Sequence, residues 1–122
     1  MITAELVSQR RDDVLIIQFN TPKLLADTTI AQIGRELLEL ADQCDGKMLI
    51  SFQGVTFMSS AMIGKIVLLN KKCTAEKTVV KLCSIAPSIM EVFEITRLNK
   101  IFAIYDSEDE ALAAFKKKGW LW

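Results

Sequence analysis

Two adjacent hydroxyl groups, those of Ser59 and Ser60, separate two apolar segments in the stretch VTFMSSAMIGKI, residues 55–66. A serine in such a place can be a catalytic nucleophile, the N-cap of a helix or a phosphate acceptor. The nucleophile needs a partner base such as histidine and is typical of a Gly-x-Ser-x-Gly turn. The chain has no histidine, and neither serine lies in that glycine pattern. A cap and a phosphate acceptor are the two roles that remain.

The composition disfavours several other classes of function. Fifteen lysines and arginines balance fifteen acidic residues, so there is no basic excess for nucleic acid or for an acidic membrane surface. The lack of histidine removes the favoured transition-metal ligand, and no GxGxxG or GxxxxGK[ST] loop occurs. We therefore expect no enzyme activity, no cofactor, no metal site, no nucleic acid and no membrane contact.

The three cysteines are few and widely spaced. Cys44, Cys73 and Cys83 form no CxxC pair, the first residues do not resemble a signal peptide, and no apolar run approaches the roughly 20 residues of a membrane span. We expect reduced, mostly packed thiols in a cytoplasmic protein.

The hydrophobic pattern alternates between strand and helix periods along the chain. Strands are predicted at residues 4–9, 14–19, 48–52, 78–83 and 101–105. Helices are predicted from residue 27 to the CDGK break, at about 60–72, at 87–95 and at 106–118. The order β-β-α-β-α-β-α-β-α indicates one α/β domain over residues 1–122, with a mixed, mostly parallel sheet of about five strands and about four helices.

Several residues predict where these elements begin and how they pack. Residues 27–29 offer side-chain N-caps to the first helix, and Gly34 is expected where that helix packs closely on the sheet. Pro22, in the NTPK segment, should stop any strand there. Ser107 and Glu110 have the spacing of a capping box at the start of the last helix.

The helix after Ser60 is apolar on nearly every side. Only Lys65 interrupts its first two turns, which otherwise contain Met62, Ile63, Ile66, Val67, Leu68 and Leu69. A helix on one sheet face normally has a polar outer side. This helix is therefore either covered on both sides or carries an exposed apolar strip, which would indicate a protein partner.

Residues 14–115 resemble the STAS domain of bacterial anti-sigma factor antagonists. That family's phosphorylation motif is an apolar pair, Asp, Ser, Ser or Thr, Gly, Leu and Gly. Phe57–Met58 match the apolar pair, Ser60 matches the phosphorylated serine, and Ile63–Gly64 match the final Leu-Gly. The later stretch SIAPSIMEVFEITRLNKIFAIYDSEDEAL resembles the family's C-terminal half.

The chain departs from that motif at three positions. Ser59 stands where the family has Asp, Ala61 where it has a second hydroxyl, and Met62 where it has Gly. We expect Met62 to add bulk beside Ser60. The loop NTPKLLADTT also lacks the Gly-acidic-x-Asp pattern that precedes the family's first helix.

The resemblance implies a phosphorylation-controlled binding switch that regulates transcription. In the family, the unphosphorylated protein binds an anti-sigma factor that is also a serine kinase and so releases the sigma factor; phosphorylation of the serine blocks this binding, and a phosphatase restores it. Ser60 is the expected phosphorylation site, with Ser59 as the alternative. The expected partner-binding residues are Ser59, Ser60, Met62, Ile63, Lys65, Leu68 and Leu69.

Two other functions stay open. The altered motif, with Trp120 and Trp122 near the chain end, is compatible with a non-phosphorylated STAS scaffold, a homodimer or a subunit of a larger signalling or transport complex. A small-molecule or nucleotide binder is the third hypothesis, and the absence of a glycine-rich phosphate loop disfavours it.

Overall fold

The computed structural model describes residues 4–118 of the chain, and side chains as far as residue 116. A five-stranded sheet has the order β1-β2-β4-β6-β7, with β1 antiparallel to β2 and the other neighbours parallel. Its strands are β1 Leu6–Arg11, β2 Val14–Phe19, β4 Lys47–Ser51, β6 Val79–Cys83 and β7 Ala103–Tyr105. The predicted mixed, mostly parallel sheet is confirmed.

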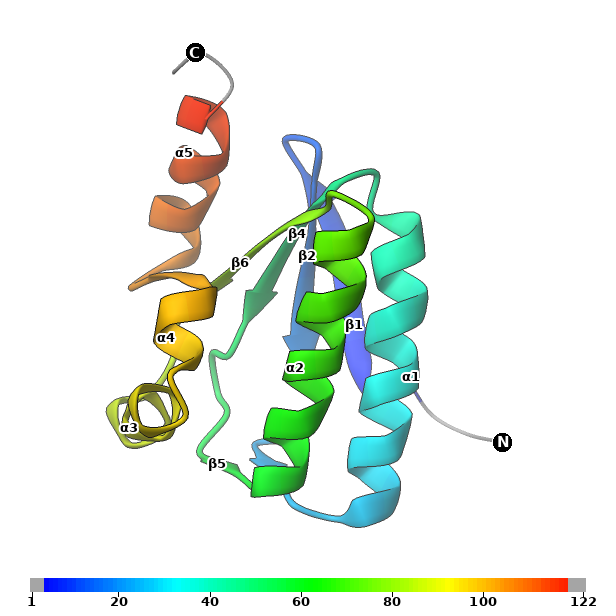
Figure 1. Cartoon of the computed structure of the whole chain (residues 1–122), viewed down its shortest axis with the longest axis vertical. Helices are drawn as coiled ribbons and strands as arrows, with labels where there is room; N and C mark the ends of the chain where they lie inside the picture. Colours follow the sequence, from blue (N-terminus) through cyan, green and yellow to red (C-terminus); the bar gives the residue numbers. More distant parts are fainter. Residues whose placement is uncertain (1–3, 119–122) are drawn as a thin grey trace.

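Helices cover both faces of this sheet. Helices α1 (Asp27–Gln43) and α2 (Ser60–Ala75) lie side by side on one face, and α5 (Glu108–Lys118) lies on the other (Figure 1). Helices α3 (Pro87–Ile95) and α4 (Leu98–Ile101) connect β6 to β7. The sequence predicted about four helices; the fifth is the single turn α4, which begins after Arg97 with its backbone in the left-handed region, φ 63°.

The sheet is buried on both faces because neighbouring residues of β2 belong to different cores. Leu15 and Ile17 pack under α1, α2 and α3, whereas Val14 and Ile16 pack under α5. Successive side chains of a strand point to opposite faces, so a strand covered on both sides reads as a continuous apolar run. This is why VLIIQF could be recognised as a strand.

A second, two-stranded parallel sheet was not predicted. It pairs β3 (Lys23–Leu24) with β5 (Phe57–Met58). The carbonyl of Pro22 accepts a hydrogen bond from the N–H of Thr56 at 2.7 Å, and that of Leu24 accepts one from the N–H of Ser59 at 3.0 Å. The strand starts directly after Pro22 and ties the segment before α1 to the segment before α2.

The first hairpin has a tighter turn than the sequence predicted. Residues 10–13 were expected to form the link, but β1 continues through Arg11 and β2 starts at Val14. Asp12 and Asp13 both have positive φ, 52° and 72°, as the two central residues of a type I′ turn require. A two-residue turn of this kind matches the twist of the strands it joins.

The helix starts divide into one correct and one wrong prediction. Ser107 Oγ accepts the N–H of Glu110 at 3.2 Å, which confirms the cap that was predicted from Ser107, while the Glu110 carboxylate accepts the N–H of Asp106, one residue before the cap, at 3.3 Å. Helix α1 instead has Ala26 at its N-cap, with no side-chain cap hydrogen bond.

Trp120 and Trp122 lie outside the described residues. Within the described part, no helix is long and apolar enough to cross a bilayer.

Candidate functional site

Ser59 occupies the N-cap position of α2 but does not cap the helix with its hydroxyl. Its backbone is extended (φ −81°, ψ 164°), and its carbonyl accepts the N–H of Met62 at 3.1 Å. The Ser59 Oγ is buried and makes no hydrogen bond with any described residue. Of the two roles that the sequence left open for these serines, Ser59 therefore takes the cap position, but its hydroxyl does not cap the helix.

Ser60 is the first residue of α2 and is exposed. The first N–H groups of a helix have no partner inside the helix and carry the positive end of its dipole. No acidic residue lies in the first turn of α2. A phosphate on Ser60 would therefore meet favourable backbone dipoles and no neighbouring carboxylate of that turn.

Helix α2 divides into a buried side and an exposed side. The buried residues are Met62, Ile66, Leu69 and Cys73. Among its exposed residues, which also include Ala61, Thr74 and Ala75, four follow one another at intervals of four, four and three and so lie along one line of the helix: Ser60, Gly64, Leu68 and Lys71. Leu68 is 51% exposed. Of the two arrangements that the sequence allowed, a helix covered on both sides is excluded, and the large apolar side chain exposed on this line is Leu68.

This exposed line continues onto the small β3–β5 sheet. Phe57, in β5, is 48% exposed, while its neighbour Met58 is buried. Leu25 follows β3 opposite Ser59 and is 46% exposed. We call this surface the Ser60 face; it consists of Leu25, Phe57, Ser60, Gly64 and Leu68. Strand β5 and the start of α2 lie together at one end of the molecule (Figure 1).

The predicted partner-binding residues separate into two groups. Ile63 and Lys65 are partly exposed beside the Ser60 face. Met62 and Leu69 are each 0% exposed, so the prediction that their side chains contact a partner is wrong. Because Met62 packs in the core, it also adds no bulk at the surface beside Ser60. Met62 and Leu69 are seven residues, or about two helical turns, apart, so both lie on the side of α2 that packs in the core.

Three residues of this surface were not predicted from the sequence: Leu25, Phe57 and Gly64. Leu25 and Phe57 are brought there by the β3–β5 pairing, which no local sequence pattern predicted. Gly64 had a usable signal, because glycine in the interior of a helix is unfavourable and calls for a reason.

Lys65 packs along α1 through an unexpected contact with Gly34. A Cβ atom placed on Gly34 would lie 2.7 Å from Cδ of Lys65. Gly34 therefore accommodates the aliphatic stem of a residue in α2, and the expectation that it packs on the sheet is wrong. Helices α1 and α2 approach each other closely at this point.

Further along the same two helices, Lys72 joins them by ion pairs. Its Nζ lies 2.8 Å from Oδ1 of Asp42 in α1 and 2.9 Å from Oε2 of Glu76. The hydrogen bonds to Asp42 and Glu76 raise the pKa of Lys72, so it stays cationic. This ion pair adds to the packing between α1 and α2.

All three cysteines are free and buried, which confirms the prediction of packed thiols. Burial raises the pKa of the Cys73 thiol from 9.0 to about 11 and raises that of Cys83 as well. A thiol with a raised pKa is a poor nucleophile at neutral pH. Among the described residues, no group of three or more Cys, Asp or Glu side chains is placed to hold a metal ion.

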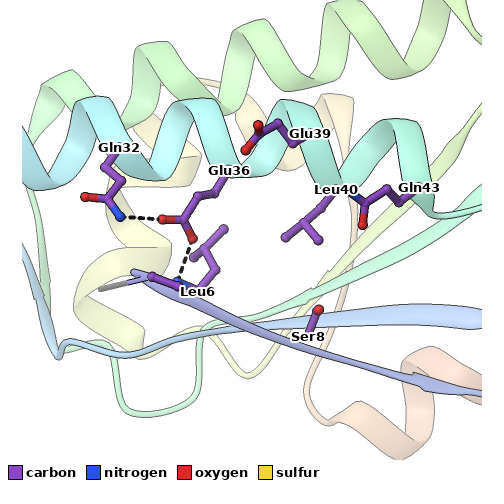
Figure 2. A pocket seen from close by; sticks show the side chains of 8 residues that line it. Leu6, Ser8, Gln32, Glu36, Glu39, Leu40 and Gln43 are labelled. Carbon is purple, nitrogen blue, oxygen red and sulfur yellow. Dashed lines mark hydrogen bonds between the residues drawn. The ribbon is translucent and has the colours of Figure 1, made fainter. Parts of the chain in front are cut away.

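A cavity of about 370 Å³ lies away from Ser60, between β1 and α1. The carboxylate of Glu36 accepts the backbone N–H of Leu6 at 3.0 Å and a hydrogen bond from Gln32 at 2.7 Å (Figure 2), and it also accepts the backbone N–H of Glu5 at 3.0 Å. These contacts attach the start of the edge strand β1 to α1. Glu36 is thus engaged in holding the fold.

Comparison with known proteins identifies the family. The family model of the STAS domain matches residues 5–111. The chain belongs to the STAS family. The protein BtrV of Bordetella bronchiseptica, which carries the name of an anti-sigma factor antagonist, is 29% identical over 85 residues, covering 70% of this chain and 73% of BtrV.

Solved structures share the same fold. An anti-sigma-factor antagonist (STAS) domain protein from Planctomyces limnophilus is 26% identical with a TM-score of 0.82, over 93% of this chain and 98% of that one. The Bacillus protein SpoIIAA in its phosphorylated form has a TM-score of 0.69 and 17% identity, over 90% of this chain and 98% of its own. The second likeness shows the fold alone.

Proposed function

We propose that this protein is an anti-sigma factor antagonist whose Ser60 face binds an anti-sigma factor with serine kinase activity. One observation carries the proposal: Ser60 is exposed at the start of α2, three residues after the exposed Phe57 and on the same line of the helix as the exposed Leu68. Exposed apolar surface of this kind is typical of protein-binding sites. The kinship with proteins named as anti-sigma factor antagonists supports the same partner class.

Phosphorylation of Ser60 is the proposed off-switch. A phosphate adds about 1.5 to 2 negative charges at neutral pH. In the free protein that charge is tolerated at the start of α2. Within a complex it would have to be desolvated between apolar side chains, which is unfavourable. The modification therefore weakens binding without unfolding the domain, and a phosphatase that removes it restores binding.

Ser60, and not Ser59, is the proposed phosphate acceptor. A kinase must bring its γ-phosphoryl group in line with the serine oxygen. The Ser60 side chain is exposed, whereas the Ser59 Oγ is buried. The accessibility of the two hydroxyls agrees with the alignment of Ser60 to the family's phosphorylated serine.

The acceptor is tested by incubating the protein with ATP and each purified serine-kinase anti-sigma factor encoded in its genome. Mass spectrometry of wild type, Ser59→Ala and Ser60→Ala then locates the phosphate. We expect phosphate on wild type and Ser59→Ala and none on Ser60→Ala. Transfer to Ser60→Ala at the wild-type rate would remove Ser60 as acceptor, and no transfer by any kinase would favour the non-phosphorylated scaffold.

The switch is tested by measuring affinity for the same anti-sigma factors. Ser60→Glu should bind at least about tenfold more weakly than wild type, because a charge is placed in an apolar interface. Ser60→Gln introduces a side chain of the same shape as that of Ser60→Glu but without the charge, so it should lose less affinity. Ser88→Glu adds a charge to an exposed serine at the start of α3 and should bind normally. Wild-type affinity of Ser60→Glu would contradict the switch.

A further inference from the structure

We infer that the partner of the Ser60 face has an apolar centre bordered by carboxylates, and that it contacts the α2 backbone at Gly64. This inference rests on the proposed function and specifies the chemistry of the partner. It is carried by two independent features of α2, namely the cations beside the face and a glycine that the domain itself does not require.

The charged side chains that α2 places next to the Ser60 face are positive. Lys65 and Lys71 follow Ser60 along α2, and neither forms an ion pair with a carboxylate in the part of the chain that the structure describes. Lys72, one residue further, is by contrast paired with Asp42 and Glu76. Helix α2 itself contains no acidic residue. Potentials at protein interfaces are complementary, so this surface fits a partner with acidic groups around an apolar centre.

The glycine at position 64 indicates that a partner approaches the backbone of α2 closely. It lies within α2, exposed, and a Cβ atom built on it would meet nothing within 4 Å. Its φ is not in the left-handed region that favours glycine. Glycine is among the poorest helix formers, and no atom of the described chain explains its presence here. Gly34 is the contrast, because the stem of Lys65 occupies the space beside it.

The line of exposed residues shows how such a partner is seated. Gly64 lies one turn from Ser60 on one side and one turn from Leu68 on the other. A side chain that reaches the helix backbone at Gly64 would therefore lie between the switch serine and the exposed leucine. Carboxylates at the border of that partner surface would attract Lys65 and Lys71 and repel a phosphate on Ser60.

The test uses the same purified serine-kinase anti-sigma factors and four variants. Gly64→Gln covers the backbone, and Lys71→Glu reverses a charge beside the face. Thr74→Gln places the same amide on another exposed residue of α2, and Lys100→Glu reverses an exposed lysine of α4. We expect at least about tenfold weaker binding for Gly64→Gln and for Lys71→Glu, and unchanged binding for the two controls.

Salt dependence separates the charge effect from a shape effect. The wild-type association rate should fall as salt is raised, because charged surfaces steer association. The rate for Lys71→Glu should depend less on salt, while Gly64→Gln should keep the wild-type dependence and dissociate faster. Thermal unfolding of each variant checks that the fold is intact.

The outcomes distinguish this inference from the proposed function. If wild type binds and Ser60→Glu does not, but Gly64→Gln and Lys71→Glu bind like wild type, the inference is overturned and the proposed switch stands. If Gly64→Gln and Lys71→Glu lose binding while Ser60→Glu retains it, the docking surface stands and the switch fails. Absence of wild-type binding to every anti-sigma factor of this class would overturn both.

Discussion

Helices α1 and α2 cover the same face of the sheet, yet their outward sides differ. Helix α1 buries Ile30, Ile33, Leu37 and Ala41 and turns charged residues such as Arg35 and Glu39 to the solvent. Helix α2 buries a similar set but exposes Gly64 and Leu68 where α1 has charges. Covering a sheet requires only one apolar side of a helix. The outward side of α2 therefore reflects a requirement other than the fold.

The largest difference in stability should be between variants on the buried side and on the exposed side of α2. Met62→Ala or Leu69→Ala would leave a cavity beneath α2 and lower the free energy of unfolding by about 2–5 kcal/mol. Leu68→Ala removes an exposed side chain and should change it by less than about 0.5 kcal/mol. Urea unfolding monitored by circular dichroism measures all three. A loss above 2 kcal/mol for Leu68→Ala would mean that its side chain is part of the core.

The affinity for the partner should distinguish the outward sides of the two helices. Leu68→Ala should weaken binding to the anti-sigma factor about tenfold or more, as expected for an apolar residue at the centre of an interface. Arg35→Ala, on the outward side of α1, should leave the affinity unchanged. Isothermal titration calorimetry compares them. Equal losses for the two variants would show that the interface extends over α1 and would remove the distinction between the helices.

Much of the fold could be predicted because its signals are local. The apolar runs of β2 and β4, the cap from Ser107 and the period of α1 all depend on residues close in sequence. The β3–β5 pairing could not be predicted, because it joins two-residue strands far apart in the chain. Helix α4 was missed because a single turn carries no periodic pattern.

The site was predicted in position and only partly in composition. Ser60 and Leu68 could be selected from the motif and the apolar helix. Met62 and Leu69 were wrongly included, because the resemblance and the apolar run do not tell which side of α2 meets the sheet. Phe57 was missed because its exposure depends on β5, an element that only the folded chain creates.

The two helical glycines should respond differently to the same substitution. Gly64→Ala should raise the free energy of unfolding by about 1 kcal/mol, because alanine is the better helix former and the site is open. Gly34→Ala should gain less or lose stability, because its Cβ must displace the stem of Lys65. Urea unfolding of both variants gives the difference.

Lys65→Ala provides the control for this pair. In that background the obstruction beside Gly34 is gone, so Gly34→Ala should gain about as much as Gly64→Ala, a non-additivity typical of residues in contact. Equal effects of the two glycine substitutions with Lys65 present would show that its stem moves aside freely. The close contact between α1 and α2 would then contribute little to stability.

The smallest effect concerns Cys73, on the inward side of α2. Burial raises the pKa of its thiol from 9.0 to about 11, so the folded state holds this proton more tightly than the unfolded state. The resulting stabilisation is complete below pH 9 and is lost as the pH rises toward 11. At pH 9.5 the loss should be less than about 1 kcal/mol. Cys73→Ala, already less stable at pH 8 because it lacks the packed sulfur, lacks this titration. The gap between wild type and Cys73→Ala in urea unfolding should therefore narrow from pH 8 to pH 9.5, and a constant gap would show that the sulfur of Cys73 is reached by solvent.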